Sequence, residues 1–263
     1  MSLAERWVHG DAYEPYVGRW SRLVAADFID WLAVPSGGNW LDVGCGTGAL
    51  SQTVLLKAEP ASVTGIDRSA DIVAYAREHT KDSRARFGVG DAMAIPLADG
   101  LFSAVVSGLV LNFVPRYDVA VAEMARVAAD GGTVAAYVWD YAGRMEMMRV
   151  FWDCAVDLDP AAAEKTEGSR FTICQPEPLA DLFRGAGLAD VEVRGIEVRT
   201  RFRDFDDYWT PFLSGQAPAP AYAMSLTEEQ RTALREHIRS RLPVASDGSI
   251  SLVARAWAVR GRK

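Results

Sequence analysis

Acidic residues and glycines, regularly spaced in one short stretch, are the residues best suited to chemistry in this chain. Residues 39–50 read NWLDVGCGTGAL, an apolar run that ends near Asp42 and continues through Gly44, Gly46 and Gly48. Glycine lacks a Cβ, so a ligand can lie directly against the backbone of such a turn. The helix that follows presents amide N–H groups and a partial positive charge. The stretch therefore predicts a nucleotide-type ligand site.

The glycine spacing alone does not identify the nucleotide. Gly44, Gly46 and Ala49 also satisfy G-x-G-x-x-G/A, the fingerprint of dinucleotide-binding turns. Asp42, however, places a charge where a dinucleotide strand usually has an apolar residue, and Gly48 adds a glycine that the fingerprint does not need. A NAD(P)-dependent oxidoreductase therefore remains an alternative.

Two more carboxylates follow strand-like segments. Asp67 closes residues 61–67, and Asp91 comes just after residues 84–89. In an open parallel sheet, ligands bind outside the carboxyl ends of the strands, and neighbouring strands lie ~4.8 Å apart. Together with Asp42, these acids would follow a ligand about as long as a nucleoside with a side chain.

Each of the three carboxylates has a chemical rationale. Asp67 stands about twenty residues after the glycines, where an acceptor for two ribose hydroxyls is expected. Asp91 can accept a hydrogen bond from an adenine amino group, while the backbone N–H after Ala92 serves a ring nitrogen. Asp42 favours a cation and would repel a pyrophosphate. The sign of that charge argues against NAD.

The first motif of the class I S-adenosylmethionine (SAM) dependent methyltransferases reads acidic-x-Gly-x-Gly-x-Gly, and the stretch that begins at Asp42 resembles it. Residues 90–97, GDAMAIPL, resemble the family's Asp-Ala-x-x-Leu/Ile-Pro segment. Residues 101–105, LFSAV, resemble its fourth strand, with Ser103 in place of the usual aspartate. The similarity covers about residues 36–140 and is closest to the small-molecule branch that includes the ubiquinone-biosynthesis C-methyltransferases.

The resemblance implies that SAM is the cofactor, with S-adenosylhomocysteine as the product. It also implies that Ser107 and Gly108 pass beneath the methionine moiety, and that Arg19 pairs with the methionine carboxylate. The predicted cofactor-binding residues are Arg19, Asp42, Gly44, Cys45, Gly46, Gly48, Asp67, Arg68, Asp91, Ala92, Met93, Ser107 and Gly108.

Composition is that of an ordinary soluble protein without a metal site. The chain has 263 residues and a net charge of −7, which argues against nucleic acid as a partner. Cys45, Cys154 and Cys174 show neither metal nor disulfide spacing, as expected of a cytoplasmic protein. The first residues lack the apolar core of a signal peptide. The most apolar window, residues 101–114, is shorter than the ~20 residues of a membrane span.

Alternating strand and helix patterns must position these residues. They predict an α/β, Rossmann-like fold with a seven-stranded, mostly parallel sheet and helices on both faces. The resemblance implies an antiparallel last strand between the fifth and the sixth. We expect a single domain over residues 1–263, with a helical cap at 1–35 and a SAM-binding core at 36–140. Helical insertions at 141–175 and 204–248 would form a lid over the acceptor.

Several element boundaries are predicted from local signals. The strands are expected at residues 40–43, 61–67, 84–89, 101–107, 133–138, 191–202 and 251–259. Thr227 and Gln230 should form a capping box. Pro115 should open a helix that Gly131 and Gly132 end.

The resemblance implies methyl transfer from SAM to a small-molecule acceptor. The donor is already activated, so alignment matters more than an obligatory base. A hydroxyl acceptor would benefit from a base, and the unranked candidates are His9, Tyr13, Asp140 and His237. A catalytically silent SAM-binding protein is a second alternative, and the protein is expected to be a monomer or a homodimer.

Aromatic and apolar residues follow the fifth and sixth strands and predict a planar or lipophilic acceptor. The predicted acceptor contacts are Asn112, Trp139, Tyr141, Met145, Met148, Trp152 and Trp209. The same residues would be expected if the insertions simply had apolar cores of their own, and the sequence leaves both interpretations open.

Overall fold

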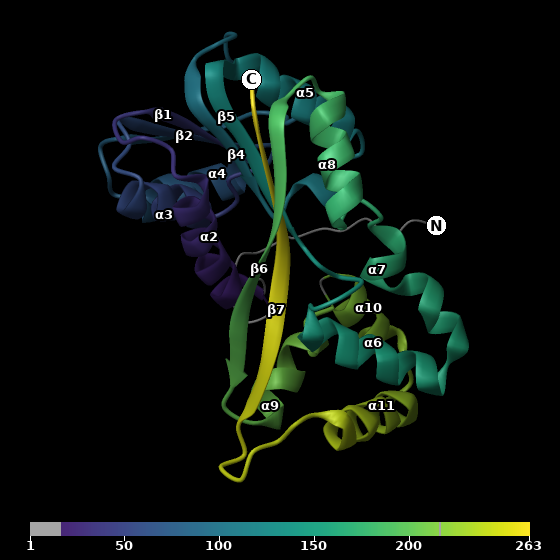
Figure 1. Cartoon of the computed structure of the whole chain (residues 1–263). Helices are drawn as coiled ribbons and strands as arrows, with labels where there is room; N and C mark the ends of the chain where they lie inside the picture. The colour runs from purple at the N-terminus through teal and green to yellow at the C-terminus, as the bar shows by residue number, and fades with distance from the viewer. Residues whose placement is uncertain (1–16, 216) are drawn as a thin grey trace. The chain divides into compact units, whose positions relative to one another are not determined.

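The computed structural model describes residues 17–215 and 217–263, which form two compact units. The sheet unit comprises residues 21–139, 173–196 and 256–263. The helical unit comprises the other described residues, which belong to the segments up to 20, 140–172 and 197–255. Figure 1 traces the chain through both. The predicted insertions fall mostly in the helical unit, and the predicted SAM-binding core falls in the sheet unit.

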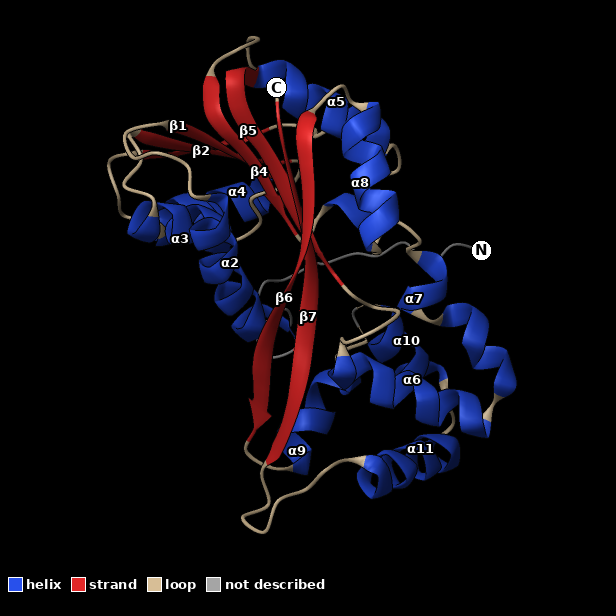
Figure 2. Ribbon diagram, in the orientation of Figure 1, coloured by secondary structure: helices blue, strands red, loops and turns tan. Residues whose placement is uncertain are grey.

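The strands form one seven-stranded sheet (Figure 2) with the order β3-β2-β1-β4-β5-β7-β6. They are β1 (Asn39–Val43), β2 (Ser62–Asp67), β3 (Ala85–Val89), β4 (Phe102–Gly108), β5 (Ala128–Trp139), β6 (Ala189–Phe202) and β7 (Ile250–Arg262). The first five strands pair in parallel, whereas β7 runs antiparallel to β5. The predicted place of the last strand, antiparallel between the fifth and the sixth, is confirmed.

The strand order reverses at β1, which pairs with β2 on one side and with β4 on the other. In register, Asp42 lies between Gly65 of β2 and Val106 of β4. In an open parallel sheet the ligand crevice lies beyond the carboxyl ends of the strands at such a reversal. A ligand site is therefore expected at the segments that follow β1 and β4.

Helices of the sheet unit cover a largely apolar sheet. They are α2 (Arg19–Leu32, whose first two residues belong to the helical unit), α3 (Ala49–Lys57), α4 (Ala70–His79), α5 (Tyr117–Val127) and α8 (Pro176–Gly185). Helices α5 and α8 lie side by side (Figure 1). Trp40, Leu41 and Val43 are fully buried, as expected for a parallel strand covered on both faces.

The N-terminal helical cap is described in part. Helix α2 occupies residues 19–32, and its predicted apolar face, Val24, Phe28, Ile29 and Leu32, is buried. Residues 1–16 of the expected cap lie outside the described residues.

The boundary predicted between the fourth and fifth strands is wrong in one respect. Helix α5 ends at Val127, and β5 begins at Ala128, so Gly131 and Gly132 lie within the strand and do not end the helix. A Cβ at Gly132 would come within 2.7 Å of the Ala129 carbonyl oxygen, and the pairing of β4 with β5 shifts register in this region. The two glycines lie in the irregular first part of β5. In the sequence alone, they look like glycines that end a helix.

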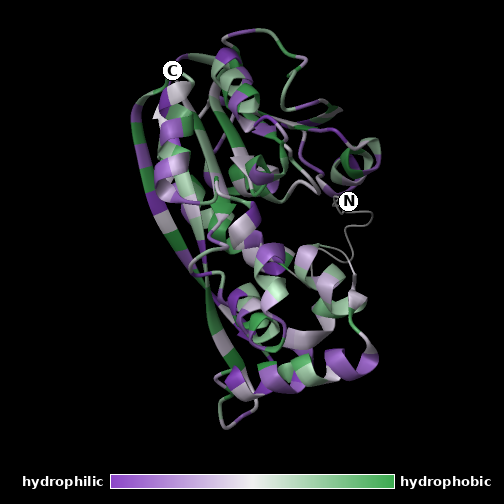
Figure 3. Ribbon diagram, turned by 90° about the vertical axis from the view of Figure 1, so that its right-hand side faces the viewer, coloured by the Kyte–Doolittle hydropathy of each residue, from purple (hydrophilic) through white to green (hydrophobic). Residues whose placement is uncertain are grey.

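The helical unit contains α6 (Glu146–Leu158), α7 (Glu167–Arg170), α9 (Phe205–Trp209), α10 (Pro218–Ser225) and α11 (Glu228–Arg241). Short 3₁₀ segments, η3 (Pro160–Lys165) and η4 (Thr210–Leu213), connect them. The capping box of Thr227 and Gln230 at the start of α11 is confirmed. Helix α11, the lowest helix in Figure 3, is mostly hydrophilic and buries Leu234 and Ile238.

Candidate functional site

The turn after β1 uses its first two amides within the protein. The N–H groups of Gly44 and Cys45 both donate to the Ile66 carbonyl oxygen, at 2.8 and 2.9 Å. Gly44 has a φ of +75°, and a Cβ there would come within 2.6 Å of Val110. Only glycine fits, because an L side chain would be both strained and crowded. These two amides are therefore not offered to an anionic ligand.

Gly46 is the open point of the turn. It has a φ of +53°, and nothing in the described chain lies within 4 Å of the position its Cβ would take. Its N–H donates to Asp67 Oδ2 at 3.2 Å, while Asp67 Oδ1 accepts from the Ser69 N–H at 2.9 Å. Asp67 thus ties the glycine turn to the start of α4. The bare face of Gly46, beside a half-buried carboxylate, is a surface on which a polar ligand can lie.

Asp42 is a buried carboxyl group with one unpaired oxygen. The residue is 1% exposed, and its Oδ2 accepts from Ser51 Oγ at 2.7 Å. Its Oδ1 is also buried and has no hydrogen-bond partner among the residues that the structure describes. Burial raises the pKa of Asp42 from 3.8 to about 7, against the hydrogen bonds from Ser51, which lower it. A buried acid with an unpaired acceptor is complementary to a cationic ligand.

Asp91 lies just past the carboxyl end of β3. It is exposed, and its Oδ1 accepts from the Met93 N–H at 2.8 Å. Ala92 and Met93 are half-buried. The predicted contact of this loop with an adenine is compatible with that placement and stays a prediction.

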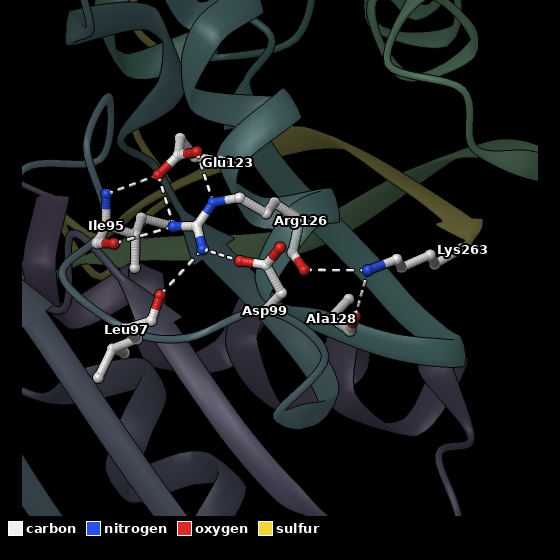
Figure 4. A network of polar contacts seen from close by, with 7 residues as sticks. All are labelled: Ile95, Leu97, Asp99, Glu123, Arg126, Ala128 and Lys263. Carbon is white, nitrogen blue, oxygen red and sulfur yellow. Dashed lines mark hydrogen bonds and ion pairs between the residues drawn. The ribbon is translucent and has the colours of Figure 1, made fainter.

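Arg126 of α5 holds the far half of the same loop (Figure 4). Its guanidinium donates to the carbonyl oxygens of Ile95 and Leu97, each at 2.9 Å. It also pairs with Glu123 at 2.7 Å and with Asp99 at 2.5 Å. Glu123 in turn accepts the Ile95 N–H at 2.9 Å. The loop is thus fixed to α5 through its backbone, a feature that the sequence analysis did not identify.

The end of β4 is joined to the end of β1. Ser107 is fully buried, and its Oγ donates to the Val43 carbonyl oxygen at 2.8 Å. A Cβ at Gly108 would come within 2.6 Å of the Tyr137 hydroxyl oxygen. Both residues therefore shape the strand ends, and their predicted contact with the cofactor remains untested. Arg68, after β2, is exposed.

Arg19 belongs to the helical unit and is packed between two rings. Its guanidinium carbon lies 4.4 Å from the ring centroid of Trp20 and 4.9 Å from that of Phe202, and its Nη1 pairs with Asp207 Oδ1 at 3.0 Å. Its Nε and Nη2 are buried and have no hydrogen-bond partner in the described part of the chain. These two donors are suited to a carboxylate.

Most predicted acceptor contacts lie in packed interiors. Trp139 is 2% exposed in the sheet unit, where Asn112, 9% exposed, has a buried Nδ2 without a partner among the described residues. In the helical unit the buried candidates are Tyr141, Met145, Met148, Trp152 and Trp209. They accompany a ring cluster in which Phe151 and Phe212 stack with centroids 4.5 Å apart. This packing agrees with the interpretation that these residues form the insertions' own core.

The catalytic candidates differ in surroundings. Asp140 is 3% exposed and accepts from the Gly143 and Arg144 N–H groups and from Arg255, whose nearest nitrogen is 2.6 Å away. That hydrogen bonding makes Asp140 an anchor between β5 and β7. His237 Nε2 pairs with Asp157 at 3.0 Å on the surface of the helical unit.

The other two candidates, His9 and Tyr13, lie outside the described residues.

Sequence reasoning missed a second buried acid, Glu167 of α7. It is 2% exposed, its Oε2 accepts from the Trp152 indole N–H, and its Oε1 is buried without a partner in the described chain. Burial raises the pKa of Glu167 from 4.5 to about 7. No pattern marks it, because Glu167 lies in the polar stretch EKTEGSR, which reads as exposed.

The described residues contain no group of three or more His, Cys, Asp and Glu side chains placed to hold a metal ion. None of the described helices is long and apolar enough to cross a membrane.

Comparison with known proteins decides the family. Residues 41–136 match the model of a methyltransferase domain. The demethylmenaquinone methyltransferase of Roseiflexus sp. (strain RS-1) is 32% identical over 175 residues, which are 62% of this chain and 72% of that relative. The ubiquinone/menaquinone biosynthesis C-methyltransferase UbiE of Desulfotalea psychrophila is 30% identical over 192 residues, 69% of this chain and 76% of that relative. The chain belongs to the class I SAM-dependent methyltransferase family.

Solved structures agree with the fold of this methyltransferase. A putative methyltransferase from Bacillus halodurans superposes with a TM-score of 0.60 at 18% identity, over 91% of this chain and 98% of that one. At that identity the likeness supports the fold alone.

The residues of the sheet unit fit SAM. Asp42 offers a buried oxygen that has no partner among the described residues, and its negative charge suits a sulfonium or an ammonium group. The open face of Gly46 leaves room at the turn. The amides of Gly44 and Cys45, which a pyrophosphate would need, are already bonded to Ile66. The cofactor is SAM, and the NAD(P) alternative is not favoured.

Proposed function

We propose that this SAM-dependent methyltransferase methylates a small acceptor that is apolar or aromatic. The observation that carries the proposal is the interior of the helical unit, where stacked rings surround few polar groups. Both relatives described above are named for quinones. Sites lined by apolar and aromatic side chains bind planar, lipophilic rings.

SAM supplies, when bound, a methyl group already activated by its positively charged sulfur. We assign Asp42 to its cationic groups and Asp67 to its ribose hydroxyls. Asp91 and the amides after Ala92 are assigned to adenine. Arg19 is assigned to the methionine carboxylate, and the support is that its Nε and Nη2 are buried donors without partners among the described residues.

The acceptor step requires alignment and exclusion of water more than a strong base. Asp140 accepts from Arg255 and from two backbone amides, and His237 pairs with Asp157 at the surface. Both side chains already have protein partners in these positions. We therefore give neither of them a proton-transfer role.

Two experiments test the function. Isothermal titration should show binding of SAM and S-adenosylhomocysteine and none of NADH. Incubation with SAM and a panel of quinols, phenols and amines, read by mass spectrometry, should give a singly methylated product from a quinol or a phenol. Binding of SAM without a product from any of these acceptors would favour the catalytically silent alternative. Binding of NADH alone would overturn the cofactor assignment.

The localisation, the oligomeric state and the absence of a nucleic-acid partner are also proposals. We propose a cytoplasmic monomer or homodimer that acts on no nucleic acid. The net charge of −7 supports the last point, because a surface of that sign repels phosphates. Light scattering of the purified chain would test the oligomeric state, and a gel-shift assay would test nucleic-acid binding.

A further inference from the structure

Glu167 is held in the helical unit by residues from two other helices. The indole N–H of Trp152, on α6, donates to Oε2. The backbone N–H groups of Glu167 itself and of Ala219, at the start of α10, also stabilise the ionised form. Residues distant in sequence thus converge on a single carboxyl group. The same neighbourhood contains an aromatic wall, in which the Trp152 and Tyr222 rings lie 5.3 Å apart.

One oxygen of this carboxyl group receives no hydrogen bond from the part of the chain that the structure describes. Oε1 is buried and has no partner among the described residues. A buried acceptor that stays unpaired is costly, and an apolar side chain of similar size would fill the space without that cost. The Trp152 indole N–H already donates to Oε2. A role in holding Trp152 therefore does not account for the buried Oε1. The arrangement is what a site for a hydrogen-bond donor needs.

We propose that Glu167 is a specificity-determining residue of the acceptor subsite, where its Oε1 accepts a hydrogen bond from a hydroxyl group on an aromatic methyl acceptor. This inference rests on the proposed function and names its substrate class, a phenol or a quinol. The flat rings of Trp152 and Tyr222 supply apolar contact for the body of such a molecule. Glu167 supplies the polar contact that distinguishes a hydroxyl from an ether.

The charge state of Glu167 sets how this contact works. Its pKa is raised by burial to about 7, and Arg170 on the same helix lowers it. Trp152 and the Ala219 N–H, from α6 and α10, do not titrate. Nearby, Lys165 of η3 lies 5.0 Å from the Tyr222 ring centroid, and the Tyr222 hydroxyl is hydrogen-bonded to Asp159. Above about pH 7 the unpaired oxygen of Glu167 only accepts, whereas the protonated group donates.

A matched pair of ligands isolates this contact. 1-Naphthol can donate a hydrogen bond, and 1-methoxynaphthalene can only accept one. In the presence of S-adenosylhomocysteine, the wild-type protein should bind 1-naphthol roughly tenfold more tightly at about pH 8. That preference should shrink as the pH falls through about 7.

The variant Glu167→Gln keeps an acceptor for the Trp152 indole and places an amide donor at the other position. It should lose the preference for 1-naphthol, or reverse it, at every pH. The matched control is Glu164→Gln, an exposed carboxyl in η3, which should keep the wild-type preference. Affinity for S-adenosylhomocysteine and the melting temperature show whether each variant is folded. The pH profile of the wild-type protein supplies the test if Glu167→Gln does not fold.

The outcomes separate this inference from the proposed function. A preference for 1-naphthol that survives in a folded Glu167→Gln variant would overturn the role of Glu167, even if methyl transfer to phenols is seen. Equal binding of the two ligands by the wild-type protein, or binding of neither, would overturn it as well. A Glu167-dependent preference without any methylated product would leave the hydrogen bond from the ligand hydroxyl to Glu167 standing and would remove the proposed methyl transfer.

Discussion

The sheet unit and the helical unit present polar groups in different ways. In the sheet unit, Asp42 and Asp67 lie near the ends of β1 and β2, and Asp91 follows β3. Backbone amides of nearby turns donate to Asp67 and Asp91. In the helical unit, Arg19 and Glu167 lie among aromatic side chains, and each retains an unpaired atom in the described chain. The acids of the sheet unit are therefore placed by local backbone geometry, whereas Arg19 and Glu167 are placed by packing between segments distant in sequence.

Removal of an aromatic ring should have the largest effect on stability and leave cofactor binding intact. Phe212 is fully buried and stacks on Phe151. Phe212→Ala should lower the free energy of unfolding by roughly 3–5 kcal/mol. Urea denaturation measures that loss, and isothermal titration with S-adenosylhomocysteine should give an affinity within about twofold of wild type. A large loss of cofactor affinity in the folded variant would show that the two regions are not independent.

A side chain on the glycine turn should damage the cofactor site itself. Gly44→Ala places a Cβ within 2.6 Å of Val110 at a φ of +75°, so we expect a loss of roughly 3 kcal/mol in stability. Binding of SAM should become undetectable by titration. Gly37→Ala is the control, because Gly37 also has a positive φ but nothing of the described chain within 4 Å of its Cβ position. Equal losses in the two variants would point to backbone strain alone.

Neutralising Asp42 should weaken SAM more than S-adenosylhomocysteine, because only SAM carries a charged sulfur. We expect Asp42→Asn to reduce the affinity for SAM by roughly tenfold to a hundredfold. In the wild-type protein, the affinity for SAM should rise with pH through about 7 as Asp42 ionises. An affinity independent of pH would contradict the assignment.

The same carboxyl group links stability to pH. Its folded pKa of about 7 lies above the ordinary 3.8, so its contribution is fully present below about pH 4 and is lost as the pH rises through 7. The stability of the wild-type protein should therefore fall relative to Asp42→Asn over that interval, by roughly 4 kcal/mol at most. Thermal unfolding in matched buffers measures the difference.

Asp67→Ala should weaken SAM binding more than tenfold, since one charge-assisted hydrogen bond contributes about 1.5–3 kcal/mol. The carboxylate also holds the Gly46 and Ser69 amides, so Asp67→Asn, which keeps one acceptor oxygen, is the companion variant. An affinity unchanged from wild type in Asp67→Ala would remove the ribose assignment.

The smallest effect is expected where the contact with SAM is indirect. Arg126 positions the loop after β3 through the Ile95 and Leu97 carbonyls. Arg126→Lys loses the forked geometry but keeps the charge, and should raise the KM for SAM by roughly threefold to tenfold with little change in kcat. Adenine recognition is measured by comparing the affinity for S-adenosylhomocysteine with the affinity for its inosine analogue. A preserved preference for the adenine form would separate Arg126 from adenine binding.

The sequence signals of the predicted cofactor region are local. Asp42 and the three glycines lie within a few residues of one another, and the strands that place Asp67 and Asp91 have clear apolar patterns. The seven-stranded sheet and the capping box at Thr227 followed from the same kind of signal or from the family resemblance.

The features that the sequence did not predict depend on contacts between distant residues, which no local pattern encodes. Gly131 and Gly132 have the types that end a helix, yet they lie in β5 because of its irregular pairing with β4. Glu167 is buried by Trp152, fifteen residues away in sequence, and by α10. The ionisation of Asp42 near neutrality likewise comes from burial, which composition does not reveal.

Cys45 is the one thiol in the glycine turn, between Gly44 and Gly46. It is 5% exposed, and burial raises the pKa of this thiol. Thiol-directed reagents attack the thiolate, so alkylation of Cys45 should proceed only during openings of the turn. The rate of Cys45 alkylation therefore reports how often the turn opens. Saturating SAM should lower that rate, and no dye or tag on the chain is needed to measure it.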